Sequence, residues 1–97
     1  MRAYCYASGL IEFGPKMPRG ALPIARGPEK KLREFIATQA RHGYATETVK
    51  GRHQKIPGSE TLLVPGVPEA PDQNAAVDSL LAWKAWIKKH APTGVEV

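Results

Sequence analysis

The feature that most constrains this chain is a ten-residue segment with three prolines, LLVPGVPEAP at 62–71. Each proline removes a backbone donor and pushes the preceding residue towards extended geometry, so the segment cannot be helical. A central strand is excluded for the same reason. We therefore expect residues 65–71 to form a stiff, extended surface segment with apolar side chains and free carbonyls, which loses little conformational entropy on docking.

Three roles are open for this segment. The first is purely structural, because prolines lower the conformational entropy of the unfolded chain. The second is docking on a protein partner, with Val67 and Pro68 among the contact residues. The third is recognition of the Val67–Pro68 bond by a host prolyl isomerase, because uncatalysed exchange of such bonds takes tens of seconds or more.

Length and composition indicate one small folded domain. The chain has 97 residues, of which 42% are apolar, and its nine prolines and nine glycines predict much loop. The chain has one cysteine, Cys5, so no internal disulfide can form. We expect Cys5 to be a small buried apolar residue, and a single free cysteine fits a reducing compartment. No window approaches the ~20 apolar residues needed to cross a bilayer, so we expect a cytoplasmic protein.

The net charge of +5 is unevenly distributed along the chain. Residues 16–55 carry ten Lys or Arg against three Glu, whereas residues 56–83 carry four acids and no Lys or Arg. This segregation predicts one basic face and one neutral-to-acidic face. The basic face could meet nucleic acid or an acidic protein surface, or consist only of solvated helix surface.

Several segments have the pattern of β-strands. Strand-forming residues on both sides of Ser8-Gly9 predict a hairpin with strands at about 2–7 and 10–14. Residues 21–25 suit a short edge strand, because the internal proline excludes them from the centre of a sheet. Residues 60–64 are expected to form the next strand.

Helical periodicity predicts two helices, at about 28–42 and 72–90. The core stripe of the second helix is expected to consist of Ala76, Val77, Leu80, Trp83 and Ile87. Trp86 projects beyond the edge of this stripe, so it either packs against the sheet or the 44–59 segment, or stays exposed as an interface anchor.

Together these elements predict an α+β domain in which a small antiparallel sheet carries two helices on one face. The sheet consists of the N-terminal hairpin plus one or two short strands. The chain 1–97 is then a single domain, with a flexible basic loop at 44–59 and the proline-rich surface segment at 65–71. Residues 93–97 are expected to fray.

The sequence lacks the motifs of catalysis, phosphate binding and metal binding. Its three histidines are far apart in the sequence, and no Cys/His cluster has metal-ligand spacing. Recognised nucleic-acid-binding motifs are also missing, and aromatic residues near the basic region are few. We therefore expect a binding protein that is not an enzyme and uses no cofactor or metal.

Four segments carry a resemblance to a known family: YASGLIEFG at 6–14, GALPIARGP at 20–28, ARHGY at 40–44 and TLLVPGVPEA at 61–70. Together they resemble the host-nuclease inhibitors of lambdoid temperate phages, the anti-RecBCD proteins. The resemblance implies a non-catalytic phage protein in the host cytoplasm. It also implies binding to the host RecBCD helicase–nuclease through the RecC subunit, which alters nuclease activity and the response to Chi and favours phage recombination.

Seven side chains are the candidates for this contact: Val67, Pro68, Trp86, Arg41, Lys50, Arg52 and Lys55. On this interpretation DNA is met only indirectly through the complex, and no membrane is involved. Mimicry of DNA is disfavoured, because a phosphate mimic should be acidic. The rival hypothesis is a basic accessory protein that binds nucleic acid itself, and a weaker one is an oligomeric structural component of the phage.

Overall fold

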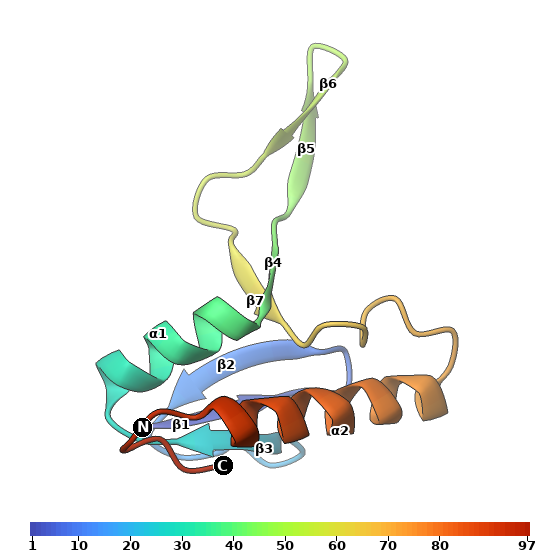
Figure 1. Cartoon of the computed structure of the whole chain (residues 1–97). Coiled ribbons are helices and arrows are strands. Elements are labelled where there is room, and N and C mark those ends of the chain that lie inside the picture. The colour runs from blue at the N-terminus through green and yellow to red at the C-terminus, as the bar shows by residue number, and fades with distance from the viewer.

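The computed structural model describes residues 1–97 and confirms the α+β class (Figure 1). An antiparallel sheet of five strands has the order β3-β1-β2-β7-β4, and a separate two-stranded sheet pairs β5 with β6. The elements are β1 (Arg2–Cys5), β2 (Leu10–Gly14), β3 (Leu22–Arg26), α1 (Glu29–Gln39), β4 (Arg41–Gly43), β5 (Thr46–Val49), β6 (Arg52–Lys55), β7 (Thr61–Leu63) and α2 (Gln73–His90). Neither helix has the length and hydropathy of a membrane span.

The N-terminal hairpin is confirmed. Strands β1 and β2 pair in antiparallel register from Arg2↔Gly14 to Cys5↔Ile11. Strand β1 ends earlier than expected, because the amide of Gly9 donates to the carbonyl of Tyr6 at 2.8 Å and closes the turn. Cys5 is a free, buried thiol, and burial raises its pKa.

Strand β3 is an edge strand, as its internal proline predicts. Its pairing with β1 contains a bulge at Ile24, so that both Ile24 and Ala25 are buried. The expectation that residues 93–97 fray was wrong. Val95 is only 7% exposed and joins the core, which brings Glu96 against Arg26, where the two residues exchange both backbone hydrogen bonds at 2.8 Å.

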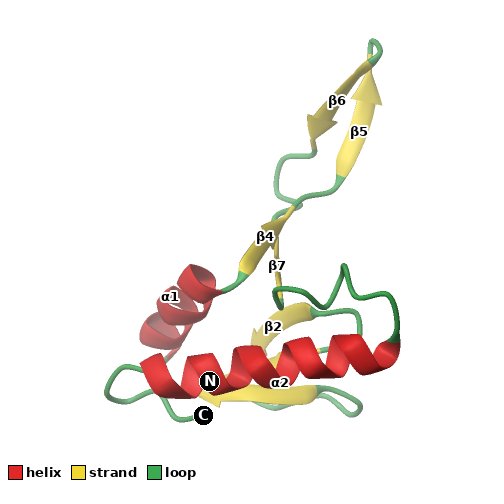
Figure 2. Cartoon of the chain, turned by 45° about the vertical axis from the view of Figure 1, so that its right-hand side comes forward, coloured by secondary structure: helices red, strands yellow, loops and turns green.

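Both helices pack on one face of the sheet and share its core (Figure 2). Helix α1 contributes Leu32 and Ile36, each with no exposed surface. Helix α2 contributes Ala76, Trp83 and Ile87, as its periodicity predicts. Inclusion of Val77 in the stripe was wrong: its side chain is 42% exposed, because it lies ~100° round the helix from Ala76.

Helix α1 is shorter than expected. It ends at Gln39, and Ala40 is extended with φ −87° and ψ 162°. Arg41–Gly43 instead form β4, which satisfies the open edge of β7. Gly43 is therefore a strand residue and not a helix stop, and a Cβ there would lie 2.9 Å from Cδ1 of Leu63, so a larger residue would make the Leu63 side chain shift.

Residues 44–59, which we name the arm, contain a β-hairpin at 46–55 where the sequence predicts a flexible basic loop. The arm projects from the rest of the molecule (Figure 1), and the whole chain, arm included, measures 48 Å along its longest axis. Two features outweigh the lack of apolar periodicity. Thr46, Thr48 and Val49 are β-branched and favour a strand, and Lys50-Gly51 adopts the positive φ values of a two-residue hairpin turn.

The proline-rich segment is not extended either. The amide of Val67 donates to the carbonyl of Val64, and that of Ala70 donates to the carbonyl of Val67, so two turns follow each other. Gly66 supplies the positive φ of 83° that reverses the chain. Val67 therefore points inwards, is only 9% exposed and packs beside Gly9 in the hairpin turn, so the expected exposed contact residue belongs to the core.

We predict that Val67→Ala lowers the free energy of unfolding by about 1–3 kcal/mol, because it leaves a cavity beneath the hairpin turn. The matched control, Val77→Ala, makes the same chemical change on an exposed helix position and should change that free energy by less than about 0.5 kcal/mol. Urea unfolding followed by tryptophan fluorescence measures both. Equal losses in the two variants would contradict the burial of Val67.

Candidate macromolecular interface

The arm is a two-stranded ribbon without a core of its own. Its strands pair in four positions, from Thr46↔Lys55 to Val49↔Arg52. All eight strand residues are exposed, and no residue of the arm belongs to the core cluster. Two-stranded hairpins of this kind are marginally stable alone, so the arm relies on its attachment to the body.

The alternation of side chains gives the arm two different faces. One face, which we name the acid-free face, consists of Tyr44, Thr46, Thr48, His53 and Lys55. The opposite face consists of Glu47, Val49, Arg52 and Gln54. Two contacts link side chains of the acid-free face: the Lys55 ammonium lies 4.1 Å from the centre of the Tyr44 ring, and Thr48 Oγ1 lies 3.4 Å from His53 Nδ1.

His42 fixes the base of the arm to the body. Its Nδ1 lies 2.6 Å from Oε1 of Glu60, and its Nε2 lies 3.0 Å from the carbonyl oxygen of Ala37 at the end of α1. Both contacts are satisfied when the imidazole is protonated, because both ring nitrogens then donate. The hydrogen bond to Glu60, followed by that to Ala37, raises the pKa of His42.

A second set of contacts closes the arm just beyond β5 and β6. The amide of Ile56 donates to the carbonyl of Ala45 at 3.0 Å. The amide of Ala45 donates to the hydroxyl of Ser59 at 3.1 Å, and that hydroxyl donates to the carbonyl of Ile56 at 2.6 Å. The two ends of the ribbon are therefore held together at Ala45 and Ile56.

Arg41 lies on the other face of β4 from His42 and is ion-paired with Glu69. This pair connects β4 to the proline-rich segment, and both side chains are about half exposed. Of the four basic candidates, Arg41 is thus the one already engaged by a carboxylate. Lys50, Arg52 and Lys55 make no ion pair and lie together on the arm.

Trp86 is 52% exposed on α2, so it is not packed against the sheet or the arm. Its Nε1 donates to Oε1 of Gln39 at 2.8 Å, and its ring lies 4.0 Å from the ring of His90. Trp83 donates to the backbone carbonyl of the same Gln39 at 3.1 Å. The indole of Trp86 therefore has a satisfied polar edge, a fixed orientation and an accessible apolar surface.

The structure thus separates the candidate residues into distinct places. Pro68 is exposed in a turn, Trp86 lies on α2, and three basic residues lie on the arm. Sequence reasoning missed three features: the acid-free face, the role of His42 and the role of Gln39. The β-branched residues and the Lys50-Gly51 pair in TETVKGRHQK could have indicated the ribbon. Nothing local in the sequence points to Gln39, which bonds to Trp86 across 47 positions.

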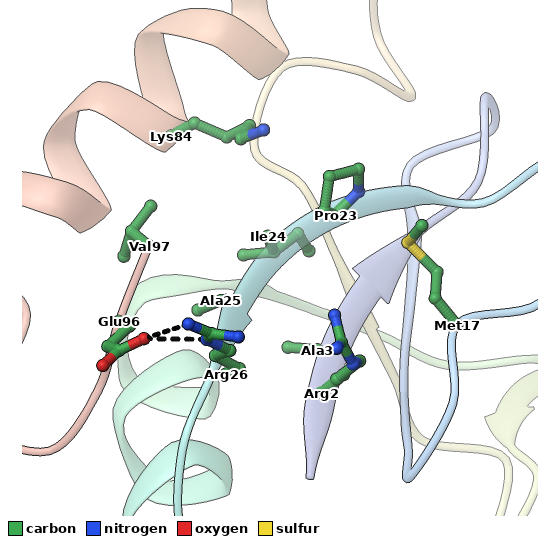
Figure 3. Close-up of a pocket in the computed structure, with 10 residues that line it drawn as sticks. All are labelled: Arg2, Ala3, Met17, Pro23, Ile24, Ala25, Arg26, Lys84, Glu96 and Val97. Atoms are coloured by element: carbon green, nitrogen blue, oxygen red, sulfur yellow. Dashed lines mark hydrogen bonds and ion pairs between the residues drawn. The ribbon is translucent and has the colours of Figure 1, made fainter.

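A shallow pocket of about 320 Å³ lies at the edge of β3 (Figure 3). Its charged lining residues are Arg2, Arg26, Lys84 and Glu96. The carboxylate of Glu96 accepts from Nε of Arg26 at 2.7 Å and lies 2.6 Å from Nη2 of that residue. No cluster of His, Cys, Asp or Glu has the geometry of a metal site.

We predict that the His42–Glu60 pair makes stability depend on pH. Because the folded-state pKa of His42 is raised above its ordinary value of 6.5, the stabilisation is complete below that value and is lost as pH rises through the folded pKa. Urea unfolding of the wild type and of His42→Gln between pH 5.5 and 9 should show a difference that shrinks with rising pH. His53→Gln is the control, and a pH-independent difference for His42→Gln would contradict the assignment.

Comparison with known proteins gives no relative. No family model matches the chain, and neither the curated proteins nor the solved structures contain a significant match. The candidate interface consists of the arm and Trp86, and it is defined by the geometry of this chain alone.

Proposed function

We propose that this chain is a non-catalytic phage protein that binds the host RecBCD helicase–nuclease and alters its nuclease activity and its response to Chi. The observation that carries the proposal is the exposed basic arm, which buries no core residue and is held to a well-packed body. The resemblance of the chain to anti-RecBCD proteins supplies the identity of the partner, with RecC as the proposed contact.

The arm and Trp86 would contribute differently to such a contact. Cationic side chains speed the encounter with an acidic surface, whereas a buried aromatic side chain contributes most of the binding energy. The Trp86 indole is already oriented by Gln39, so it loses little side-chain entropy on burial. A standard interface buries ~800 Å² on each partner, which a chain of this size can supply.

Binding without catalysis can still change the activity of a large enzyme. If the chain has higher affinity for one conformational state of the helicase–nuclease, its binding shifts the enzyme towards that state. A modified response to Chi, with continued activity at DNA ends, is the outcome expected of such a shift. The proposed function therefore needs neither a cofactor nor a catalytic group from this chain.

The decisive experiment removes the arm without disturbing the body. Because Ala45 and Ile56 are hydrogen-bonded, residues 46–55 can be replaced by Asn-Gly, a two-residue hairpin turn. We predict that this variant keeps the melting temperature of the wild type within a few degrees but no longer captures the helicase–nuclease from nuclease-treated host lysate. Mass spectrometry of the captured proteins measures the effect.

The control variant, Lys30→Ala with Lys89→Ala, removes from the body the same net charge of +2 that the replacement removes from the arm. It should capture the enzyme like the wild type. Failure of the wild type to capture the enzyme without DNA would refute the proposed partner. Equal capture by the variant without the arm would refute the proposed role of the arm.

Pro68 gives a second, separate proposal, that a host prolyl isomerase binds the turn around this residue. Pro68 is exposed while its neighbour Val67 is anchored in the core, so the ring is accessible on a fixed backbone. We predict that Pro68→Ala abolishes capture of the isomerase and leaves capture of the helicase–nuclease intact. Equal capture of the isomerase by the wild type and by Pro68→Ala would refute this proposal, and so would a failure of the wild type to capture it.

A further inference from the structure

We infer that the arm binds duplex DNA directly, with the acid-free face of the β5–β6 ribbon lying in the major groove. This inference goes beyond the proposed function, in which DNA is met only through the helicase–nuclease. It rests on the charge of the arm, on its shape and on the hydrogen-bonding groups of one face. It does not depend on which protein, if any, the chain also binds.

The charge of the arm suits a polyanion. Three cations, Lys50, Arg52 and Lys55, stand against the single acid Glu47, and none of the three is ion-paired. The register places Glu47 on the face opposite Lys55. One face of the ribbon can therefore approach phosphates without bringing a carboxylate towards them.

The shape of the arm suits a groove. It is one ribbon of two short strands, exposed on both faces, and it stands clear of both helices (Figure 2). The major groove of B-form DNA is ~12 Å wide and admits a two-stranded ribbon of this kind. The Lys50-Gly51 turn at its tip adds a cation at the leading end.

Apart from the Tyr44 ring, against which the Lys55 ammonium lies, the acid-free face offers hydrogen-bond donors and no large apolar side chain. Thr46, Thr48, His53 and Lys55 can all donate to phosphate oxygens or base edges. The exposed aliphatic side chain of the strands, Val49, lies on the opposite face. Protein interfaces instead concentrate apolar anchors in a core depleted of charge. The composition of this face therefore suits DNA as its occupant and leaves the opposite face, with Val49, to a protein.

Tyr44 holds Lys55 in place for this contact. The ammonium of Lys55 lies 4.1 Å from the centre of the Tyr44 ring, which restricts the long side chain to the acid-free face. Lys55 is therefore the residue whose loss should weaken DNA binding most. Arg52 is its natural control, because it lies on the same strand, has the same charge and projects from the opposite face.

Fluorescence anisotropy with a labelled 30-base-pair duplex tests the inference on the purified full chain. The wild type should bind at 50 mM NaCl and weaken steeply by 200 mM. Lys55→Ala should weaken binding at 50 mM about fivefold or more and lower the salt slope by about one, whereas Arg52→Ala should have less than half that effect. Thr46→Val with Thr48→Val keeps charge and strand propensity and should also weaken binding.

Melting temperatures close to that of the wild type show that the variants are folded. Absence of salt-dependent binding by the wild type, equal losses for Lys55→Ala and Arg52→Ala, or tighter binding of a 30-nucleotide single strand would each overturn the inference. The proposed function is tested by a different measurement, the capture of a protein from lysate without DNA. A failure of DNA binding can therefore be told apart from a failure of the proposed function.

Discussion

The chain depends on the burial of one thin apolar layer between a single face of the sheet and the two helices. The core cluster has 13 residues, which come from strands β1, β2 and β3, from both helices and from the segments around Val64, Val67 and Val95, whereas the arm contributes none. Leu32, Ile36, Val64 and Ile87 have no exposed surface, so substitutions there should be felt throughout the body. The arm lies outside this layer and is free to vary in sequence without loss of the fold.

Local pattern was sufficient where local interactions decide the structure. The Ser8-Gly9 turn, the edge position of Pro23 and the helical spacing of Leu32 and Ile36 were all predictable from the sequence. Non-local contacts decided the rest. Val67 turns inwards because the core beneath Gly9 accepts it, which no short window reveals.

The candidate interface was only partly predictable for the same reason. Lys50, Arg52 and Lys55 were recognisable as basic, but the placement of Arg52 and Lys55 on opposite faces depends on the register of a hairpin that lacks an apolar pattern. The orientation of the Trp86 indole depends on its hydrogen bond to Gln39 at the end of another helix. Charge and composition therefore lead only to the prediction of a binding protein, whereas the place of each candidate residue comes from the tertiary structure.

The pairing of Glu96 with Arg26 has a consequence for the behaviour of the protein at high concentration. The backbone N–H and C=O of Arg26 are hydrogen-bonded to Glu96, and Pro23 has no N–H. The outer edge of strand β3 therefore lacks a continuous row of free backbone groups on which another copy could pair. At the other end of the sheet, β4 has only three residues. The interrupted edge at β3 and the short edge at β4 therefore leave little backbone on which a second copy could add a strand to the five-stranded sheet.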